Sequence, residues 1–413
     1  MTGEALLDSR TAWIRLSAII TLSMLGGVGM WSVIVALPYV QAEFGVTRGA
    51  ASLPYTLTML GFGAGGILMG RLTDRFGAMR PLMGATVMLA AGYVLAGMAP
   101  DLAFYTLAQG LMIGMLGASA AFAPLVADAS LWFRRRRGTA VALAASGNYL
   151  AGVVWPPVLT WLIGAHGWRV AHMMVGGICL LTMLPLALVL RARAPGSRDG
   201  EGPGEAGRAR PLGLSRNGLT VILCCAGVAC CVAMSMPQVH IVAYCGDLGY
   251  GVARGAEMLS VMLACGIVSR IGSGLIADRI GGLATLLLGS VLQGLALSLF
   301  LFFDGLASLF MLSALFGVVQ GGIVPSYAVI VRESFPVSEV GTRVGIVLMA
   351  TLVGMALGGW LSGVIFDLTG SYAAAFLNGV IWNAANVLIV AWLLLRGRRA
   401  AGRVPASPAG LVL

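Results

Sequence analysis

The stretch GRLTDRFGAMR runs from Gly70 to Arg80 at the end of an apolar segment, and a copy of it lies far downstream. The copy is GLIADRIGG, from Gly274 to Gly282. Four residues recur at a constant offset of 204: Gly70, Asp74, Arg75 and Gly77 return as Gly274, Asp278, Arg279 and Gly281. Three more recur at an offset of 207: Gly138, Gly147 and Gly152 return as Gly345, Gly354 and Gly359. Two sets at nearly equal offsets predict two homologous halves.

The composition excludes a soluble protein. Of the 413 residues, 59% are hydrophobic and only 10% are charged, whereas a soluble domain has about 25% charged residues. Apolar spans of about 20 residues, long enough to cross a hydrocarbon core of about 30 Å, recur along the chain. We therefore expect an all-α membrane protein with twelve transmembrane helices. The predicted spans are 14–38, 51–70, 82–99, 103–126, 139–163, 170–190, 218–242, 256–276, 283–303, 306–330, 344–365 and 374–395.

A segment rich in Gly, Pro and charge, SRDGEGPGEAGRARPLG, divides these spans into two sets of six. Its composition is typical of a flexible linker. The sequence predicts an N-terminal six-helix half (1–191), a cytoplasmic linker (192–217), a C-terminal six-helix half (218–396) and a cytoplasmic tail (397–413).

The arginines predict the orientation of the chain. All 26 cationic residues are Arg, and 22 of them lie in the termini, the linker and the loops on the linker's side. The opposite loops contain only Arg48, Arg169 and Arg254. By the positive-inside rule, both termini and the linker are cytoplasmic in a bacterial inner membrane. Because these arginines lie in short loops, the net charge of +10 does not indicate nucleic-acid binding.

With its GRLTDRFGAMR loop and degenerate copy, the chain resembles the major facilitator superfamily. Six further stretches are similar to the monocarboxylate and oxalate–formate porters of that superfamily: MWSVIVALPYVQAEFGVTRGAAS (30–52), WFRRRRGTAVALAASGNYLAG (132–152), GWRVAHMM (167–174), VHIVAYCGDLGY (239–250), SRIGSGLIADRIG (269–281) and FDLTGSYAAAF (366–376). The resemblance covers nearly the whole chain and implies the major facilitator fold. Relatives in animals carry an Asp where this chain has Gly266 and a Lys near Trp31; the resemblance ties both to proton coupling.

Arg270 is the most informative single residue. It lies eight residues before Asp278, about 12 Å inside the membrane at the helical rise of 1.5 Å per residue. An intramembrane Arg costs at least about 2.5 kcal/mol on insertion scales and is a functional candidate by default. No other predicted span contributes a mid-membrane carboxylate, so we expect the carboxylate of a substrate to be the counter-ion. A planar guanidinium suits bidentate binding of a carboxylate.

Three deep polar residues are candidate partners of Arg270 in substrate binding: Asn148 and Tyr149 in the fifth span and Tyr327 in the tenth. The resemblance implies a ligand contact for Tyr327. Each also suits an ordinary helix–helix hydrogen bond. His240, near the far end of the seventh span, is a candidate for proton coupling because histidine titrates near neutral pH; a structural role is the alternative.

Two matching charge clusters are predicted at the cytoplasmic ends of the spans. Each combines the repeated Asp-Arg pair with an acid at the end of the fourth or tenth span and an Arg nine or ten residues later. The residues are Asp74, Arg75, Asp128 and Arg137 in the first half, and Asp278, Arg279, Glu333 and Arg343 in the second. The resemblance implies that such clusters lock the cytoplasmic side while the outside is open. The positive-inside rule alone would explain the arginines of these clusters but not the acids paired with them.

These features predict a proton-linked secondary active transporter of small monocarboxylates such as lactate or pyruvate, which works by alternating access. The expected partners are the substrate, protons and membrane lipid. We expect a monomer with no cofactor and no metal site, and no nucleophile–base pair in the spans indicates an enzyme. One alternative is an oxalate–formate-type organic anion antiporter, for which a second mid-membrane cation is expected. Another is a transport-dead membrane sensor of the same fold, which binds its ligand without flux.

Overall fold

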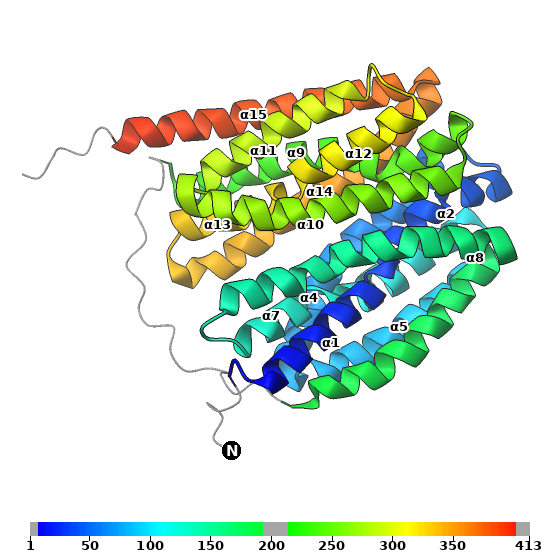
Figure 1. Ribbon diagram of the computed structural model, residues 1–413, viewed down its shortest axis with the longest axis horizontal. Coiled ribbons are helices and arrows are strands. Elements are labelled where there is room, and N and C mark those ends of the chain that lie inside the picture. Colours follow the sequence, from blue (N-terminus) through cyan, green and yellow to red (C-terminus); the bar gives the residue numbers. More distant parts are fainter. Residues whose placement is uncertain (1–6, 193–213, 402–413) are drawn as a thin grey trace, which may run out of the picture.

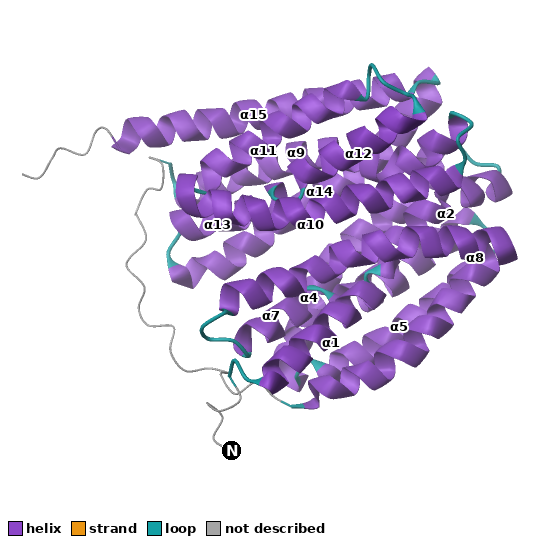
Figure 2. Cartoon of the chain, in the orientation of Figure 1, coloured by secondary structure: helices purple, strands orange, loops and turns teal. Residues whose placement is uncertain are grey.

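The computed structural model describes residues 7–192 and 214–401. Within these residues every regular element is a helix (Figure 2). The predicted all-α architecture is confirmed for this part of the chain. Most of the predicted linker (193–213) and the end of the predicted tail (402–413) lie outside the described residues.

The first half contains the following helices: α1 (Arg10–Gly26), α2 (Val28–Phe44), α3 (Arg48–Ala51), α4 (Leu53–Phe76), α5 (Met79–Gly97), α6 (Leu102–Leu107), η2 (Ala108–Gly117), η3 (Ala118–Ala121), α7 (Ala123–Leu131), α8 (Arg137–Ala187) and η4 (Leu188–Arg191). The second half contains α9 (Arg216–Asp247), α10 (Val252–Ile280), α11 (Gly282–Leu299), α12 (Leu306–Gln320), α13 (Ile323–Ser334), α14 (Val337–Thr369) and α15 (Tyr372–Ala401).

Several helices start where a short polar side chain satisfies a free backbone N–H group. The Ser9 hydroxyl accepts from the N–H of Ala12, and the Asp101 carboxylate accepts from the N–H of Phe104 at 2.8 Å. Ser215 caps α9 in the same way. These residue types are the preferred N-caps because their oxygens replace the missing intrahelical acceptor.

The described residues contain 11 helical stretches that are long and apolar enough to cross a membrane. One of them, Gly138–Arg191, has 54 residues and covers both the fifth and the sixth predicted span. Gly167 interrupts it with φ 78° and ψ 158°, and α8 folds back there in Figure 1. The stretch therefore crosses twice, which accounts for twelve crossings.

The two halves lie side by side (Figure 1). They meet where α3 and α4 pack on α14, where α2 packs on α9, and where α8 packs on α10. We call the end of the bundle with residues 71–80, 128–137, 274–281 and 332–343 the linker end. The opposite end, with residues 44–49, 247–251 and 366–372, is the Arg48 end.

Candidate functional site

Arg270 lies on α10 at the contact between the halves. Its Nη1 donates to the carbonyl of Ala145 on α8 at 3.3 Å, and its Nε donates to the carbonyl of Gly321 at 3.4 Å. Its guanidinium carbon lies 4.4 Å from the centre of the Tyr149 ring. Arg270 thus touches both halves, and the carbonyl of Gly321 is available because the helix is interrupted there, between α12 and α13.

These contacts leave the guanidinium of Arg270 under-used. Both hydrogen bonds are longer than the usual 2.9–3.0 Å for N–H···O, and they engage two of five N–H donors. In the described part of the chain, no Asp or Glu forms an ion pair with Arg270, which is half-buried. The arrangement offers a positive, partly desolvated fork to an anion.

Gly266 makes the stacking of Tyr149 on Arg270 possible. A Cβ atom at Gly266 would lie 2.6 Å from Cε1 of Tyr149, which is closer than real Cβ contacts come. The Tyr149 ring therefore fills the space that a side chain at position 266 would need. An Asp at this position could not coexist with the present position of the ring. In this chain the group beside Arg270 at position 266 is thus the ring of Tyr149 and not a carboxylate.

Asn148 precedes Tyr149 on α8 and packs against other helices of the first half. Its carbonyl accepts from Nε1 of Trp31 at 3.2 Å. Its Oδ1 lies close to Gly27, where an added Cβ would be 3.0 Å away. The side chain thus points toward the junction of α1 and α2, and the structure does not bring it to the guanidinium of Arg270.

Tyr327 on α13 is fully buried inside the second half. Its hydroxyl donates to Oδ1 of Asn386 at 3.1 Å, and Nδ2 of Asn386 donates to the hydroxyl of Ser290 at 2.8 Å. Tyr327 therefore links α13, α15 and α11. In this state its hydroxyl is engaged within the second half, away from the Arg270–Tyr149 contact.

Arg48 forms a polar cluster between the halves at the Arg48 end. Its Nη2 donates to the carboxylate of Asp247 at 3.0 and 3.3 Å, and its Nη1 donates to the hydroxyl of Tyr372. The Tyr372 hydroxyl donates to Asp247 at 2.9 Å. Arg48 belongs to the first half and is only 5% exposed, while Asp247 and Tyr372 belong to the second.

Asp367 contributes to the same contact by binding the backbone of the first half. Its carboxylate accepts from the N–H groups of Arg48 and Gly49 at 2.8 and 2.7 Å, at the start of α3. The guanidinium of Arg48 also lies 5.1 Å from the centre of the Phe366 ring. We call Arg48, Asp247, Asp367 and Tyr372 the Arg48 cluster. It ties the two halves together at this end.

His240 on α9 is fully buried beside the Arg48 cluster. Its Nε2 donates to the carbonyl of Gly359 on α14 at 2.8 Å, and its ring centre lies 6.4 Å from that of Tyr372. Its Nδ1 has no hydrogen-bond partner among the described residues. The position next to an inter-half contact is compatible with a coupling role.

At the linker end of the first half, Asp128 is paired with Arg15, which the sequence analysis did not include. Nε and Nη2 of Arg15 donate to the two Asp128 oxygens at 2.8 and 2.9 Å, and Arg15 is 3% exposed. Asp74 and Arg75 are exposed and line the same cavity as this pair. The side chain of Arg137 lies outside the described residues.

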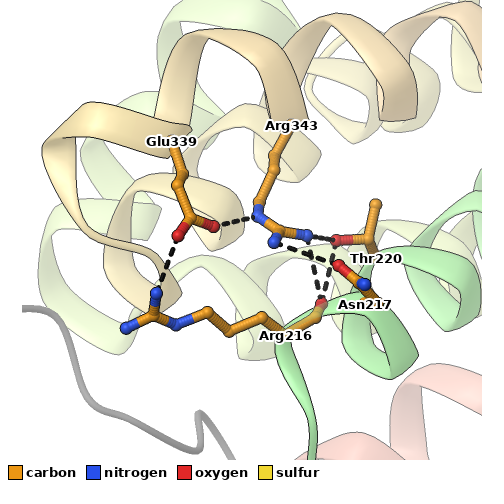
Figure 3. Close-up of polar contacts among 5 residues, drawn as sticks. All are labelled: Arg216, Asn217, Thr220, Glu339 and Arg343. Atoms are coloured by element: carbon orange, nitrogen blue, oxygen red, sulfur yellow. Dashed lines mark hydrogen bonds and ion pairs between the residues drawn. The ribbon is translucent and has the colours of Figure 1, made fainter.

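At the linker end of the second half, Arg343 is paired with Glu339 (Figure 3). Nε of Arg343 donates to Glu339 at 2.7 Å, and Nη1 of Arg216 donates to the other Glu339 oxygen at 2.7 Å. Glu333 instead accepts from the N–H of Gly282 at 3.1 Å. Asp278 and Arg279 are exposed.

No hydrogen bond or ion pair between described residues joins the halves at the linker end. The inter-half hydrogen bonds of the described residues belong to the Arg48 cluster, to Arg270 with Ala145, and to Thr56, whose hydroxyl donates to the carbonyl of Ala356. The two ends of the interface therefore differ in how strongly they are tied.

Sequence reasoning counted Arg48 only as a loop charge. Its partners are 199 to 324 residues away along the chain, so spacing does not reveal them. The available signal was a helix-capping Thr47 followed by an Arg on a side that has few cations. Among the described residues, no group of three or more His, Cys, Asp and Glu side chains is placed to hold a metal ion.

Comparisons with known proteins agree with this architecture. The profile of the Major Facilitator Superfamily matches residues 19–306 and 273–412. Monocarboxylate transporter 13 from Bos taurus is 30% identical over 308 residues, covering 74% of this chain and 71% of that protein. The MFS-type transporter pynF from Aspergillus niger is 25% identical over 311 residues, covering 73% and 69%.

Among solved structures, the fold is similar to that of a bacterial homologue of the human lysosomal transporter Spinster, in an inward-facing, unoccupied conformation. The TM-score is 0.71 at 15% identity, with 96% of this chain and 100% of the other covered. At this identity the likeness concerns the fold alone.

Proposed function

Because the chain belongs to the Major Facilitator Superfamily and is a multi-pass membrane transporter and not an enzyme, we propose that it carries small monocarboxylates by alternating access. Lactate and pyruvate are the substrates that we expect. The linker end faces the cytoplasm of a bacterial cell, with both termini on that side, as the distribution of arginines suggests.

One observation carries this proposal: Arg270 lies between the halves with two carbonyl contacts and an aromatic face, and no acid among the described residues pairs with it. A charge in such a place needs water or an anion to offset its desolvation. A carboxylate bound through both oxygens meets that need with charge-assisted hydrogen bonds. Because the ligand must leave again, the contact is made anew in each cycle.

The same site favours one carboxylate over two. In the described part of the chain, Arg270 is the cation that lies at this contact between α8 and α10, so the second carboxylate of oxalate or succinate would be desolvated without a partner, which is costly. The oxalate–formate-type antiporter is for this reason the weaker alternative. Asn148 and Tyr327 belong to the proposed site only in a state of the cycle that reorients them, since here the Asn148 side chain lies beside Gly27 and the Tyr327 hydroxyl donates to Asn386.

Proton coupling is the second part of the proposal. His240 is one candidate, because its Nδ1 is free of partners among the described residues and it adjoins the Arg48 cluster. The substrate–Arg270 pair is the other, because a neutral acid can leave where an anion cannot. Both routes allow an imposed inward proton gradient to drive accumulation.

The test is uptake of labelled lactate into proteoliposomes by the wild type, Arg270→Ala and Arg270→Lys. Arg270→Ala should abolish saturable uptake and remove the stabilisation of the folded protein by lactate. Arg270→Lys keeps the charge but loses the planar fork, so it should retain little activity. Arg254→Ala is the matched control, since Arg254 is exposed and bonds only to Glu257 within its own helix.

Near wild-type uptake by Arg270→Ala would contradict the site. Competition by unlabelled acids tests the substrate class separately: lactate and pyruvate should displace the label better than oxalate or succinate. Oxalate outcompeting lactate about tenfold would favour the antiporter. Lactate binding without flux in the wild type would favour a sensor.

A further inference from the structure

A cavity of about 880 Å³ lies at the linker end of the first half, apart from Arg270. It is bounded by α1, the end of α4, the start of α5, α7 and the end of η4 with Ala192. Four arginines and two aspartates line it: Arg15, Arg75, Arg80, Arg191, Asp74 and Asp128. Arg15 and Asp128 neutralise each other. Three arginines and one aspartate remain to set the charge of the cavity.

The second half shows what occupies the corresponding place there. Gly77 and Gly281 are repeat equivalents and have nearly the same backbone, with φ 80°, ψ 167° and φ 82°, ψ 162°. After Gly281, the N–H of Gly282 donates to both Glu333 oxygens at 3.1 and 3.2 Å. An internal carboxylate thus occupies the start of α11.

The first half lacks that internal anion. Asp128 lies near the end of α7 as Glu333 lies near the end of α13, but both Asp128 oxygens accept from Arg15. α5 starts without a side-chain cap, and within the described residues the N–H of Ala78, the equivalent of Gly282, has no hydrogen-bond partner. Ala78, Met79 and Arg80 at this helix start line the cavity. The cavity therefore combines an excess of arginines with free backbone donors.

We infer that this cavity, which we call the arginine cavity, binds the phosphate group of an anionic ligand. Arg80, Arg191 and Arg75 supply guanidinium donors, and the start of α5 supplies N–H groups with a favourable dipole. A phosphate monoester has the charge and the number of acceptor oxygens to use several of these donors together. The headgroup of an anionic lipid and a free phosphate compound share this chemistry.

The experiment measures binding to the full-length, delipidated protein at constant ionic strength. Glycerol 3-phosphate is the soluble probe, read as thermal stabilisation, and phosphatidic acid against phosphatidylcholine is the lipid probe, read by native mass spectrometry. The test variant is Arg80→Ala with Arg191→Ala. The control is Arg71→Ala with Arg332→Ala, which removes the same charge from exposed positions outside the cavity.

The test variant should bind either probe about tenfold more weakly than the wild type, since it loses two charge-assisted contacts, and the control should bind normally. Asp74→Asn, which removes the remaining negative charge, should bind more tightly. Binding of phosphatidic acid alone identifies a lipid headgroup, and binding of glycerol 3-phosphate alone identifies a soluble phosphate compound. Equal loss in the test and control variants, or no binding of either probe, overturns the inference.

Discussion

At the Arg48 end, a guanidinium of the first half binds Asp247 and Tyr372 of the second, while Asp367 holds the backbone beside it. At the linker end, Asp74 and Arg75 are as exposed as their repeat equivalents Asp278 and Arg279, and no polar contact between described residues crosses from one half to the other. Both ends therefore contain charges of both signs, but they are joined across the interface at one end only.

Under the proposed alternating-access mechanism, we interpret this difference as one of two states, in which the Arg48 end is closed. Arg48 is buried, whereas its partner Asp247 is exposed to solvent. While the halves are in contact at this end, the buried guanidinium depends on the hydrogen bonds that the second half supplies. Arg48 is 5% exposed and has several partners, so its cluster is either complete or open. Exposed charges at the other end are free to pair when the halves approach there. We propose on this basis that the two ends close alternately.

Among changes at the two ends of the interface, removing the Arg48 side chain should have the largest effect. Arg48→Ala leaves Asp247 and the Tyr372 hydroxyl without their partner in the first half and should shift the equilibrium away from closure at this end. We expect uptake to fall by about tenfold or more, while the protein still inserts. The measurement is lactate uptake, together with labelling of a cysteine placed at the Arg48 end.

Arg254→Ala is the control for this variant, because it removes an exposed cation from the same end and breaks only an ion pair to Glu257 within α10. Unchanged uptake and unchanged labelling in Arg48→Ala would show that the Arg48 cluster does not govern closure.

Neutralising the repeated aspartates should have a smaller effect. In this state Asp74 and Asp278 have no ion pair among the described residues, so Asp74→Asn and Asp278→Asn remove interactions that form only when the linker end closes. Uptake should slow by a few-fold, about 1 kcal/mol in the barrier, with lactate binding largely kept. Complete loss of binding in both folded variants would assign these aspartates to recognition instead.

The smallest effect is expected at His240. His240→Gln keeps an N–H donor for the carbonyl of Gly359 but cannot titrate. Accumulation driven by an inward proton gradient should fall by about twofold relative to exchange in the same vesicles. A variant that keeps the full response to the gradient would leave the substrate–Arg270 pair as the route for coupling.

The repeat and the helices could be predicted because they depend on local patterns, and Arg270 could be singled out for the same reason; its role in binding stays a prediction. The segment Gly70–Arg80 and its copy can be recognised by comparing the sequence with itself. A single cation in an apolar span is equally easy to find. The contribution of Gly266 could be predicted only in part from the sequence. Its absence of a side chain suggested a missing acid, but the ring that fills the space comes from Tyr149, which lies more than a hundred residues earlier on another helix.

The pairing of charges at the helix ends could not be predicted. Spacing along the chain groups Asp128 with Asp74 and Arg75, whereas the folded chain gives its two oxygens to Arg15. Which Arg forms a bidentate pair depends on how the helices pack, and distance along the sequence does not reveal this. The Arg48 cluster has the same origin, since it is assembled from the ends of three helices of the other half.

The comparison between the two ends is tested most directly by two distances in one protein. Spin labels at Ala42 and Leu248 span the halves at the Arg48 end, and labels at Phe76 and Ile280, which are repeat equivalents, span them at the linker end; all four positions are exposed. The seven native cysteines are replaced first, and lactate uptake checks that background. Pulsed electron paramagnetic resonance with and without lactate should reveal two populations, in which one distance lengthens as the other shortens. Distances that stay single and unchanged in both pairs, in a protein that transports lactate, would contradict alternating closure of the two ends.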